Sequence, residues 1–69
     1  MVLTNVNSSN IDAIGYENEL LVIRFLTGSV YIYSGVPKEV FDALSAAESK
    51  GKFLNLEIKG KYSYYKLTK

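Results

Sequence analysis

The sequence predicts an α+β domain, in which an antiparallel sheet of three to four strands packs one longer and one short helix on one face. Two runs rich in β-branched and aromatic residues, 20–26 and 30–34, flank a turn signal at Gly28. Pro37 stands before a stripe of apolar residues at helical spacing. Residues 61–67 alternate weakly, as an edge strand does. The expected order of elements is β-β-β-α-α-(β).

The N-terminal part carries weaker signals. We expect one domain over residues 1–69, with residues 1–7 forming a loose N-terminal segment because they are short and polar. Residues 11–16 contain β-branched and aromatic side chains and are predicted to form the first strand. Residues 17–19 are predicted to turn the chain, since Asn18 tolerates a positive φ.

The central hairpin decides where two tyrosines point. Side chains alternate along a strand, so a change of one residue in the loop moves the next strand's side chains to the other face. A two-residue loop would set Phe25 opposite Val30 and leave Tyr31 and Tyr33 beside Arg24. A three-residue loop would set Phe25 opposite Tyr31 and turn both tyrosines toward the core. The residues alone leave both alternatives open.

Proline is well suited to the first position of a helix, so Pro37 marks the start of the longer helix. Its apolar stripe is spaced three and four residues apart and is formed by Val40, Phe41, Leu44 and Ala47. Phe41 is the largest of these and is expected to be the main core residue of the helix. Gly51 is expected to end or interrupt this helix, and residues 52–58 are predicted to form the short one, closed by Gly60.

The composition argues against several classes of protein. The chain has no cysteine and no histidine, so a thiolate or imidazole metal site and the usual proton shuttle at neutral pH are missing. We therefore expect no metal, no cofactor and no enzymatic activity. No apolar run approaches the ~20 residues that cross a bilayer, and the N-terminus lacks the basic start of a secretory signal. These features predict a cytoplasmic protein without a membrane partner.

Positive charge gathers in the last third of the chain. Residues 1–49 hold two basic side chains against six acidic ones, a net charge of −4, whereas residues 50–69 hold six lysines against Glu57, a net charge of +5. Lysines interleaved with aromatic residues suit a phosphate backbone and splayed bases. The alternative is that the lysines keep a tyrosine-rich tail soluble. The candidate nucleic-acid-binding residues are Lys50, Lys52, Lys59, Lys61, Tyr31, Tyr33 and Tyr62.

Taken together, several short motifs resemble the KTSC domain, a small domain found alone or at the C-terminus of some lysyl-tRNA synthetases. The resemblance covers about residues 6–67. Family members favour a polar residue between the two tyrosines, which implies that Tyr31 and Tyr33 pack in the core. Ile32 is a departure from that pattern. The matching segments, in order, are Ser8-Ser9-Asn10-Ile11, Gly15-Tyr16, Phe25 with Gly28, Tyr31-Ile32-Tyr33, Gly35-Val36-Pro37, Lys50-Gly51-Lys52-Phe53, Ile58-Lys59-Gly60-Lys61-Tyr62 and Tyr64.

Two functions follow as hypotheses. The resemblance implies an association with tRNA-handling enzymes, and with the basic, tyrosine-rich surface it favours a small non-catalytic binding module for RNA. The alternative is a protein–protein interaction or structural module without nucleic-acid binding. An exposed aromatic pair beside the lysines would favour RNA. An exposed apolar patch with Leu20, Val22 or Leu26 would favour a protein partner.

Overall fold

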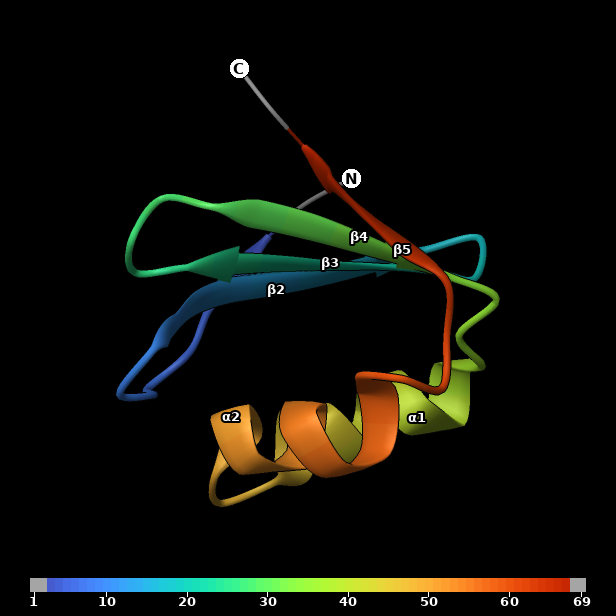
Figure 1. Cartoon of the computed structure of the whole chain (residues 1–69). Helices are drawn as coiled ribbons and strands as arrows, with labels where there is room; N and C mark the ends of the chain where they lie inside the picture. Colours follow the sequence, from blue (N-terminus) through green and yellow to red (C-terminus); the bar gives the residue numbers. More distant parts are fainter. Residues whose placement is uncertain (1–2, 68–69) are drawn as a thin grey trace.

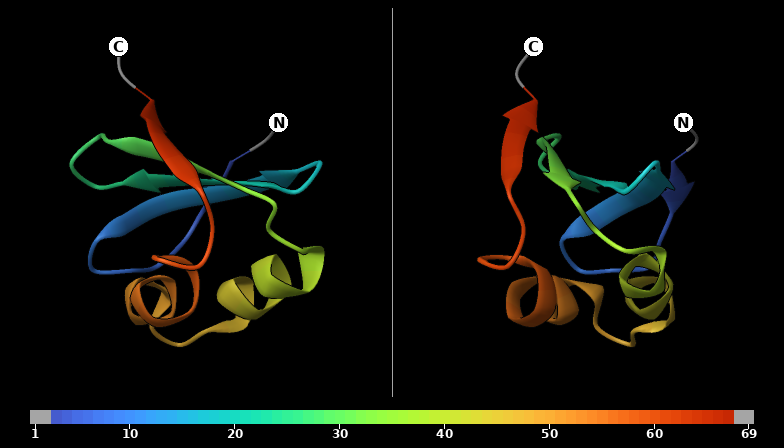
Figure 2. Two further views of the ribbon diagram at one scale, coloured as in Figure 1. Left: turned by 45° about the vertical axis from the view of Figure 1, so that its right-hand side comes forward. Right: turned by 90° about the vertical axis from the view of Figure 1, so that its right-hand side faces the viewer.

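The structure, a computed structural model, describes residues 3–67. It has two layers (Figure 1). One layer is a five-stranded antiparallel sheet whose strands follow the chain, β1-β2-β3-β4-β5. The other layer is a pair of helical segments side by side under one face of the sheet, as the turned views show (Figure 2). We call the helix-covered face the inner face and the opposite one the outer face.

The predicted α+β class and the order of its elements are confirmed, with one more strand than the three to four expected. The elements are β1 (Thr4–Asn5), β2 (Ile11–Glu17), β3 (Leu20–Phe25), β4 (Val30–Ser34), α1 (Lys38–Ala46), α2 (Lys50–Phe53), the π-helix η1 (Leu54–Ile58) and β5 (Tyr64–Leu67).

The additional strand is β1, which lies in the segment that was expected to be loose. Its two residues pair with β2, and the Asn5 side-chain amide donates to the Asp12 carbonyl at 3.3 Å. The Val6 N–H donates to the same carbonyl at 3.1 Å, and the Val6 side chain packs against the core. The expectation of a loose segment is therefore wrong for Thr4–Asn5, because pairing satisfies backbone groups on the edge of β2.

A two-residue turn joins β2 to β3. Asn18 has φ 51° and Glu19 has φ 65°, and the paired strands end at Glu17 and Leu20. Two positive φ angles define a type I′ turn, whose twist matches that of the strands it joins. Asparagine accepts this conformation readily, whereas glutamate does so with strain.

We predict that Glu19→Gly stabilises the fold by about 0.5–1 kcal/mol. Glycine adopts positive φ without a steric penalty, and the gain in the folded state exceeds its entropic cost. Urea unfolding followed by circular dichroism measures the difference. The same substitution at Glu39, in the first turn of α1, is the control and is expected to destabilise. An unchanged or lower midpoint for Glu19→Gly would show that this turn is not strained.

The central hairpin has neither of the two registers considered from the sequence. Arg24 pairs with Val30 and Leu21 with Tyr33. The Phe25 N–H donates to the Ser29 carbonyl at 2.8 Å, so the loop comprises residues 26–28. The loop has three residues, like the second alternative, but it begins one residue earlier in the chain. Side chains therefore alternate as in that alternative, and both tyrosines of β4 face inward, as favoured.

The longer helix begins after Pro37, as predicted, and ends at Ala46. Its fully buried side chain is Leu44 and not Phe41. Phe41 is half-buried and stacks on Tyr16, with 5.2 Å between the ring centroids. The Tyr16 hydroxyl donates to the Val36 carbonyl at 2.6 Å, which fixes this stacked pair beside the start of the helix. The expectation that Phe41 is the main core residue of α1 is corrected accordingly.

The second helical segment consists of α2 and η1, which follow one another directly. It starts earlier than predicted and contains Gly51 instead of following it. Ser49 caps it by accepting from the Lys52 N–H at 3.4 Å. A Cβ atom at position 51 would lie 2.6 Å from the Asn10 side-chain oxygen. Gly51 is therefore accounted for by a close approach to the loop before β2, and not by a helix end. Gly60, with φ +81°, does follow the helix as predicted.

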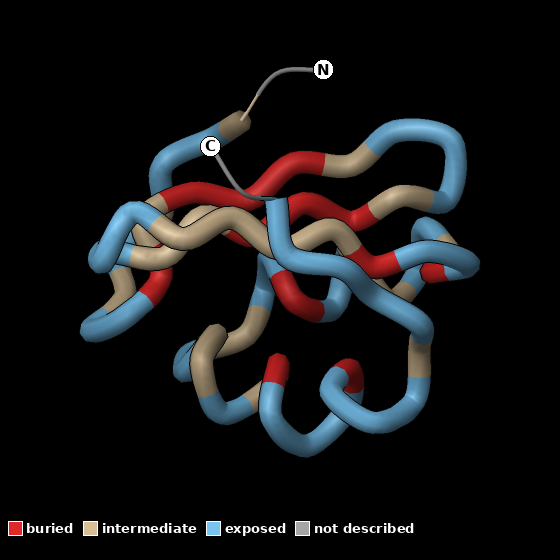
Figure 3. Tube along the Cα trace, turned by 45° about the horizontal axis from the view of Figure 1, so that its top comes forward, coloured by how far each residue is buried: buried red, intermediate tan, exposed pale blue. Residues whose placement is uncertain are grey.

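The core lies between the inner face and the helices, where the buried parts of the chain face one another (Figure 3). Its fully buried large side chains are Tyr33, Ile11, Leu21, Ile23, Leu44, Leu54, Ile58 and Val36. The strand β5 is exposed along its whole length. Within residues 3–67, the helices are too short to span a membrane.

Candidate functional site

A pocket of about 620 Å³ opens between the inner face and the end of the second helical segment. We call it the tyrosine pocket. Its apolar lining comes from four rings, those of Phe25, Tyr31, Tyr33 and Tyr64. Its size falls within the range of roughly 300–1,000 Å³ that is common for small-molecule sites. A second pocket, of about 360 Å³, is smaller and lies beside β1 and α1.

The rings form a contiguous series. Phe25 meets Tyr31 edge to face, with 5.5 Å between centroids and 89° between planes. Tyr64 tilts over Tyr31 at 5.6 Å and over Tyr33 at 5.4 Å. These are ordinary aromatic contacts, so each ring holds its neighbour in place. Tyr33 is 1% exposed and serves as the base of the series, while Tyr64 is 57% exposed and forms its outer wall.

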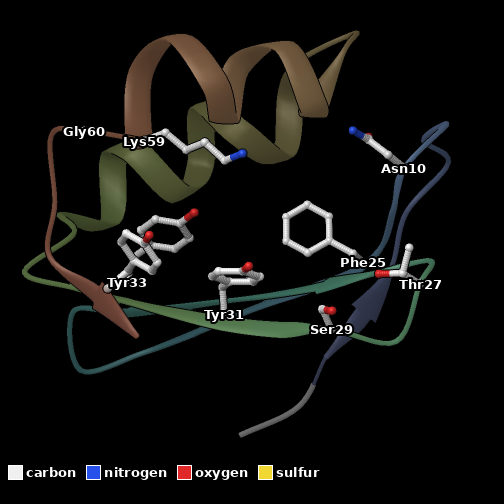
Figure 4. A pocket seen from close by; sticks show the side chains of 9 residues that line it. Asn10, Phe25, Thr27, Ser29, Tyr31, Tyr33, Lys59 and Gly60 are labelled. Atoms are coloured by element: carbon white, nitrogen blue, oxygen red, sulfur yellow. The ribbon is translucent and has the colours of Figure 1, made fainter. Parts of the chain in front are cut away.

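The polar groups of the pocket are unevenly distributed. The Lys59 side chain reaches over the rings from the helix side (Figure 4). Asn10, Thr27 and Ser29 lie at the hairpin end of the pocket (Figure 4). Lys59 is the only residue of the lining whose side chain is charged at neutral pH, since no carboxylate contributes. The pocket therefore favours an anionic ligand.

The structure brings only some of the predicted site residues together. Lys59 shares the tyrosine pocket with Tyr31 and Tyr33. Lys50 lies at the other pocket and donates to the Ala47 carbonyl at 3.0 Å. Lys61 pairs with Glu57 at 3.5 Å, and Lys52 is exposed. The four lysines thus line two pockets and the surface around the second helical segment.

The predicted aromatic residues differ in accessibility. Tyr33 is buried, so its ring cannot stack on a base from the surface, in agreement with the favoured core alternative. Tyr31 is half-buried and contributes to the pocket wall. Tyr62 is half-buried and packs against the core away from the lining. Of the three, only Tyr31 offers a ring to a ligand.

Several lining residues were not predicted from the sequence. Phe25 entered only through the hairpin register and a family motif, and Tyr64 only as part of a family motif. The polar members Asn10, Thr27 and Ser29 sit in turn segments, where polarity alone carries no functional signal. A signal for Tyr64 was available, because a tyrosine on a predicted edge strand next to Tyr31 and Tyr33 would complete an aromatic row.

Metal binding finds no support in residues 3–67. No group of three or more aspartates and glutamates comes together there. Asp12 instead pairs with Arg24, at 2.8 Å between a carboxylate oxygen and Nε. This pair is partly exposed, and surface pairs of this kind contribute about 0–1 kcal/mol.

Burial raises the pKa of the Tyr33 hydroxyl above its ordinary value of 10.0, and the neighbouring Tyr64 and Tyr31 raise that pKa further. The neutral phenol is therefore favoured in the folded state. Its contribution to stability is intact below pH 10 and is lost as the pH rises through the folded-state pKa.

We predict that Tyr33→Phe reduces the loss of stability at alkaline pH. The variant has no phenol to ionise at this buried position, so its urea midpoint should fall less than that of the unmodified protein between about pH 8 and pH 11. Tyr65→Phe removes an exposed phenol from the same sheet and should leave the loss unchanged. Equal losses in the Tyr33→Phe variant and the unmodified protein would contradict the prediction.

The fold and pocket define a small domain in which a five-stranded meander covers a helix pair and holds an aromatic pocket at one side. Residues 7–62 match the KTSC domain family. The chain also superposes on the crystal structure of a KTSC domain protein from Yersinia pestis, with a TM-score of 0.93, 38% identity and 97% of each chain covered. The protein belongs to the KTSC domain family.

The chain is similar to proteins of about its own length and to a small part of a much longer enzyme. A protein of Tsukamurella paurometabola is 48% identical over 59 residues, covering 83% of this chain and 88% of that protein. An uncharacterised protein of Stutzerimonas stutzeri is 35% identical over 65 residues, covering 90% and 92%. A lysine–tRNA ligase of Nostoc punctiforme is 40% identical over 68 residues, which is 96% of this chain but 12% of the ligase.

Proposed function

We propose that this domain is a small non-catalytic binding module for single-stranded RNA. The tyrosine pocket carries the proposal, because it brings aromatic rings together with Lys59, which belongs to the basic last third of the chain. Aromatic rings stack on bases of any sequence, and lysines bind the phosphate backbone. Similarity to a small part of a lysine–tRNA ligase, an enzyme named for acting on tRNA, agrees with this proposal.

The phosphate contacts are assigned to three lysines. Lys59 lies at the tyrosine pocket, Lys61 follows two residues later, and Lys52 projects from the same helical segment. Lys50 is left out because its ammonium group already donates to a backbone carbonyl. Lys61 is kept because its pair with Glu57 is exposed, and exposed pairs contribute little. If all three engage single-stranded RNA, the slope of log K against log salt should be about −2, since each neutralised phosphate contributes about −0.7.

We predict that replacing Lys52 and Lys61 together by alanine weakens RNA binding and flattens the salt slope by about 1.4, whatever the RNA sequence. Both side chains are exposed, so the fold should remain stable. Fluorescence anisotropy with a labelled ten-nucleotide RNA at several salt concentrations measures the slope. Lys38→Ala is the control, because Lys38 lies outside the basic third and pairs with Asp42. No binding by the unmodified protein at about 50 mM salt, where phosphate contacts are strong, would refute the function.

A protein-interaction module is the second candidate, and the outer face favours it. No helix within residues 3–67 covers this face (Figure 2). Tyr65 and Leu67 pair with Ile32 and Val30 of β4 and are 55% and 51% exposed. Leu26 is also exposed, whereas Val22 is buried and Leu20 is half-buried. Loss of the RNA function in the test above would leave this surface as the candidate.

A further inference from the structure

We infer that the tyrosine pocket is a mononucleotide site, which takes one nucleobase against Tyr31 and Tyr64 and holds its phosphate on Lys59. The inference rests on the proposed function and gives it a specific ligand. It requires that a free nucleotide binds without the rest of an RNA chain.

The geometry of the rings leaves no space for a base between them. The centroids of Tyr31 and Tyr64 are 5.6 Å apart, and those of Tyr31 and Phe25 are 5.5 Å apart. Both distances lie within the range of direct aromatic contact, about 4.5–7 Å, so a base cannot insert between these rings. It can only stack from the open side. The Phe25 ring lies perpendicular to the Tyr31 ring and bounds one end of the space in which a base would stack.

The remaining lining fits the other parts of a nucleotide. Lys59 supplies the single positive charge, and no carboxylate opposes a phosphate there. Its ammonium group makes no ion pair within residues 3–67. At the hairpin end, Asn10, Thr27 and Ser29 offer donors and acceptors to a base edge (Figure 4). The Ser8 hydroxyl donates to the Asn10 side-chain oxygen at 3.1 Å and orients this amide.

The test is an NMR titration of the intact protein with AMP, adenosine and ribose 5-phosphate at low salt. AMP should shift the ring signals of Tyr31, Tyr64 and Phe25 and the amide signal of Gly60. Adenosine should shift the same rings with lower affinity, and ribose 5-phosphate should shift none of them. AMP at 10 mM without effect on these rings would overturn the inference.

Two matched pairs of variants separate the roles. Lys59→Ala should weaken AMP binding about tenfold and leave adenosine binding unchanged, since a charged hydrogen bond is lost. Lys38→Ala should leave both unchanged, because Lys38 pairs with Asp42 and lies outside the lining of the tyrosine pocket. Tyr64→Ala should weaken AMP and adenosine equally, by roughly 5- to 150-fold, which corresponds to 1–3 kcal/mol of stacking. Tyr65→Ala, on the opposite face of β5, should have no effect. Equal effects of the two tyrosine variants would also overturn the inference.

The experiments can refute the mononucleotide inference and the proposed RNA function independently of each other. Binding of the ten-nucleotide RNA with a lysine-dependent slope, but without AMP in the pocket, would refute the inference and retain the function. Binding of AMP in the pocket by a protein that does not bind the RNA would support the inference and refute the function.

Discussion

Tyr33→Ala is expected to unfold most of the protein. Tyr33 is the largest fully buried side chain of the core and lies on the inner face of β4. Truncation of a buried aromatic side chain to alanine costs about 3–5 kcal/mol, through lost burial and the cavity left behind. A domain of this size has a total stability on the order of 5 kcal/mol, and no disulfide supports it. Urea unfolding followed by far-UV circular dichroism measures the loss.

Tyr65→Ala is the matched control for this prediction. Tyr65 is also a tyrosine of the sheet, but it lies on the outer face and is 55% exposed. Its truncation should cost less than about 1 kcal/mol, as substitutions on a surface usually do. Tyr33→Phe keeps the buried ring and should also remain folded at neutral pH. A melting temperature within a few degrees of the unmodified protein for Tyr33→Ala would show that this position is not central to the core.

Leu44→Ala is expected to have the second-largest effect, a loss of about 2–5 kcal/mol. Leu44 is 0% exposed and is the residue by which α1 enters the core. Its replacement leaves a cavity between α1 and the sheet, which a small domain cannot easily close. The measurement is again the urea midpoint and slope.

The control is the same substitution at an exposed helical leucine. Leu56, in η1, is 60% exposed, and Leu56→Ala should change the stability by less than about 0.5 kcal/mol. The contrast therefore isolates burial from the change in side chain. Similar losses at Leu44 and Leu56 would mean that helix formation, and not core packing, decides the stability of this layer.

The strands and helix starts were predictable because their signals are local. Pro37 marks the start of α1, and Gly28 with the flanking apolar runs marks the central hairpin. The register of that hairpin was not predictable, because a three-residue loop that contains Gly28 can begin at Leu26 or at Thr27. The faces of Tyr31 and Tyr33 were favoured correctly, but through the resemblance to the KTSC family, because the residues alone left the parity of the loop open.

Features that depend on contacts between distant segments could not be predicted. β1 has two residues and therefore shows no alternation. Gly51 fits a helix end by composition, and only its approach to Asn10 explains its place inside α2. The same holds for the pocket, since Phe25 and Tyr64 come from strands that are far apart in the sequence. The lysines were identifiable, but their division between two pockets depends on the fold.

The π-helix η1 has a consequence for the angular position of the residues that follow it. A π turn contains one residue more than an α turn, and one residue corresponds to about 100° of rotation around a helix axis. The Lys59 N–H donates to the Leu54 carbonyl at 2.8 Å, five residues back, so the wider turn sets the position from which Lys59 reaches the tyrosine pocket. Deleting one residue from this turn would rotate Lys59 about the axis while leaving the composition almost unchanged. The number of residues in η1 therefore determines the side of the helix axis from which Lys59, the charged residue of the lining, approaches the tyrosine pocket.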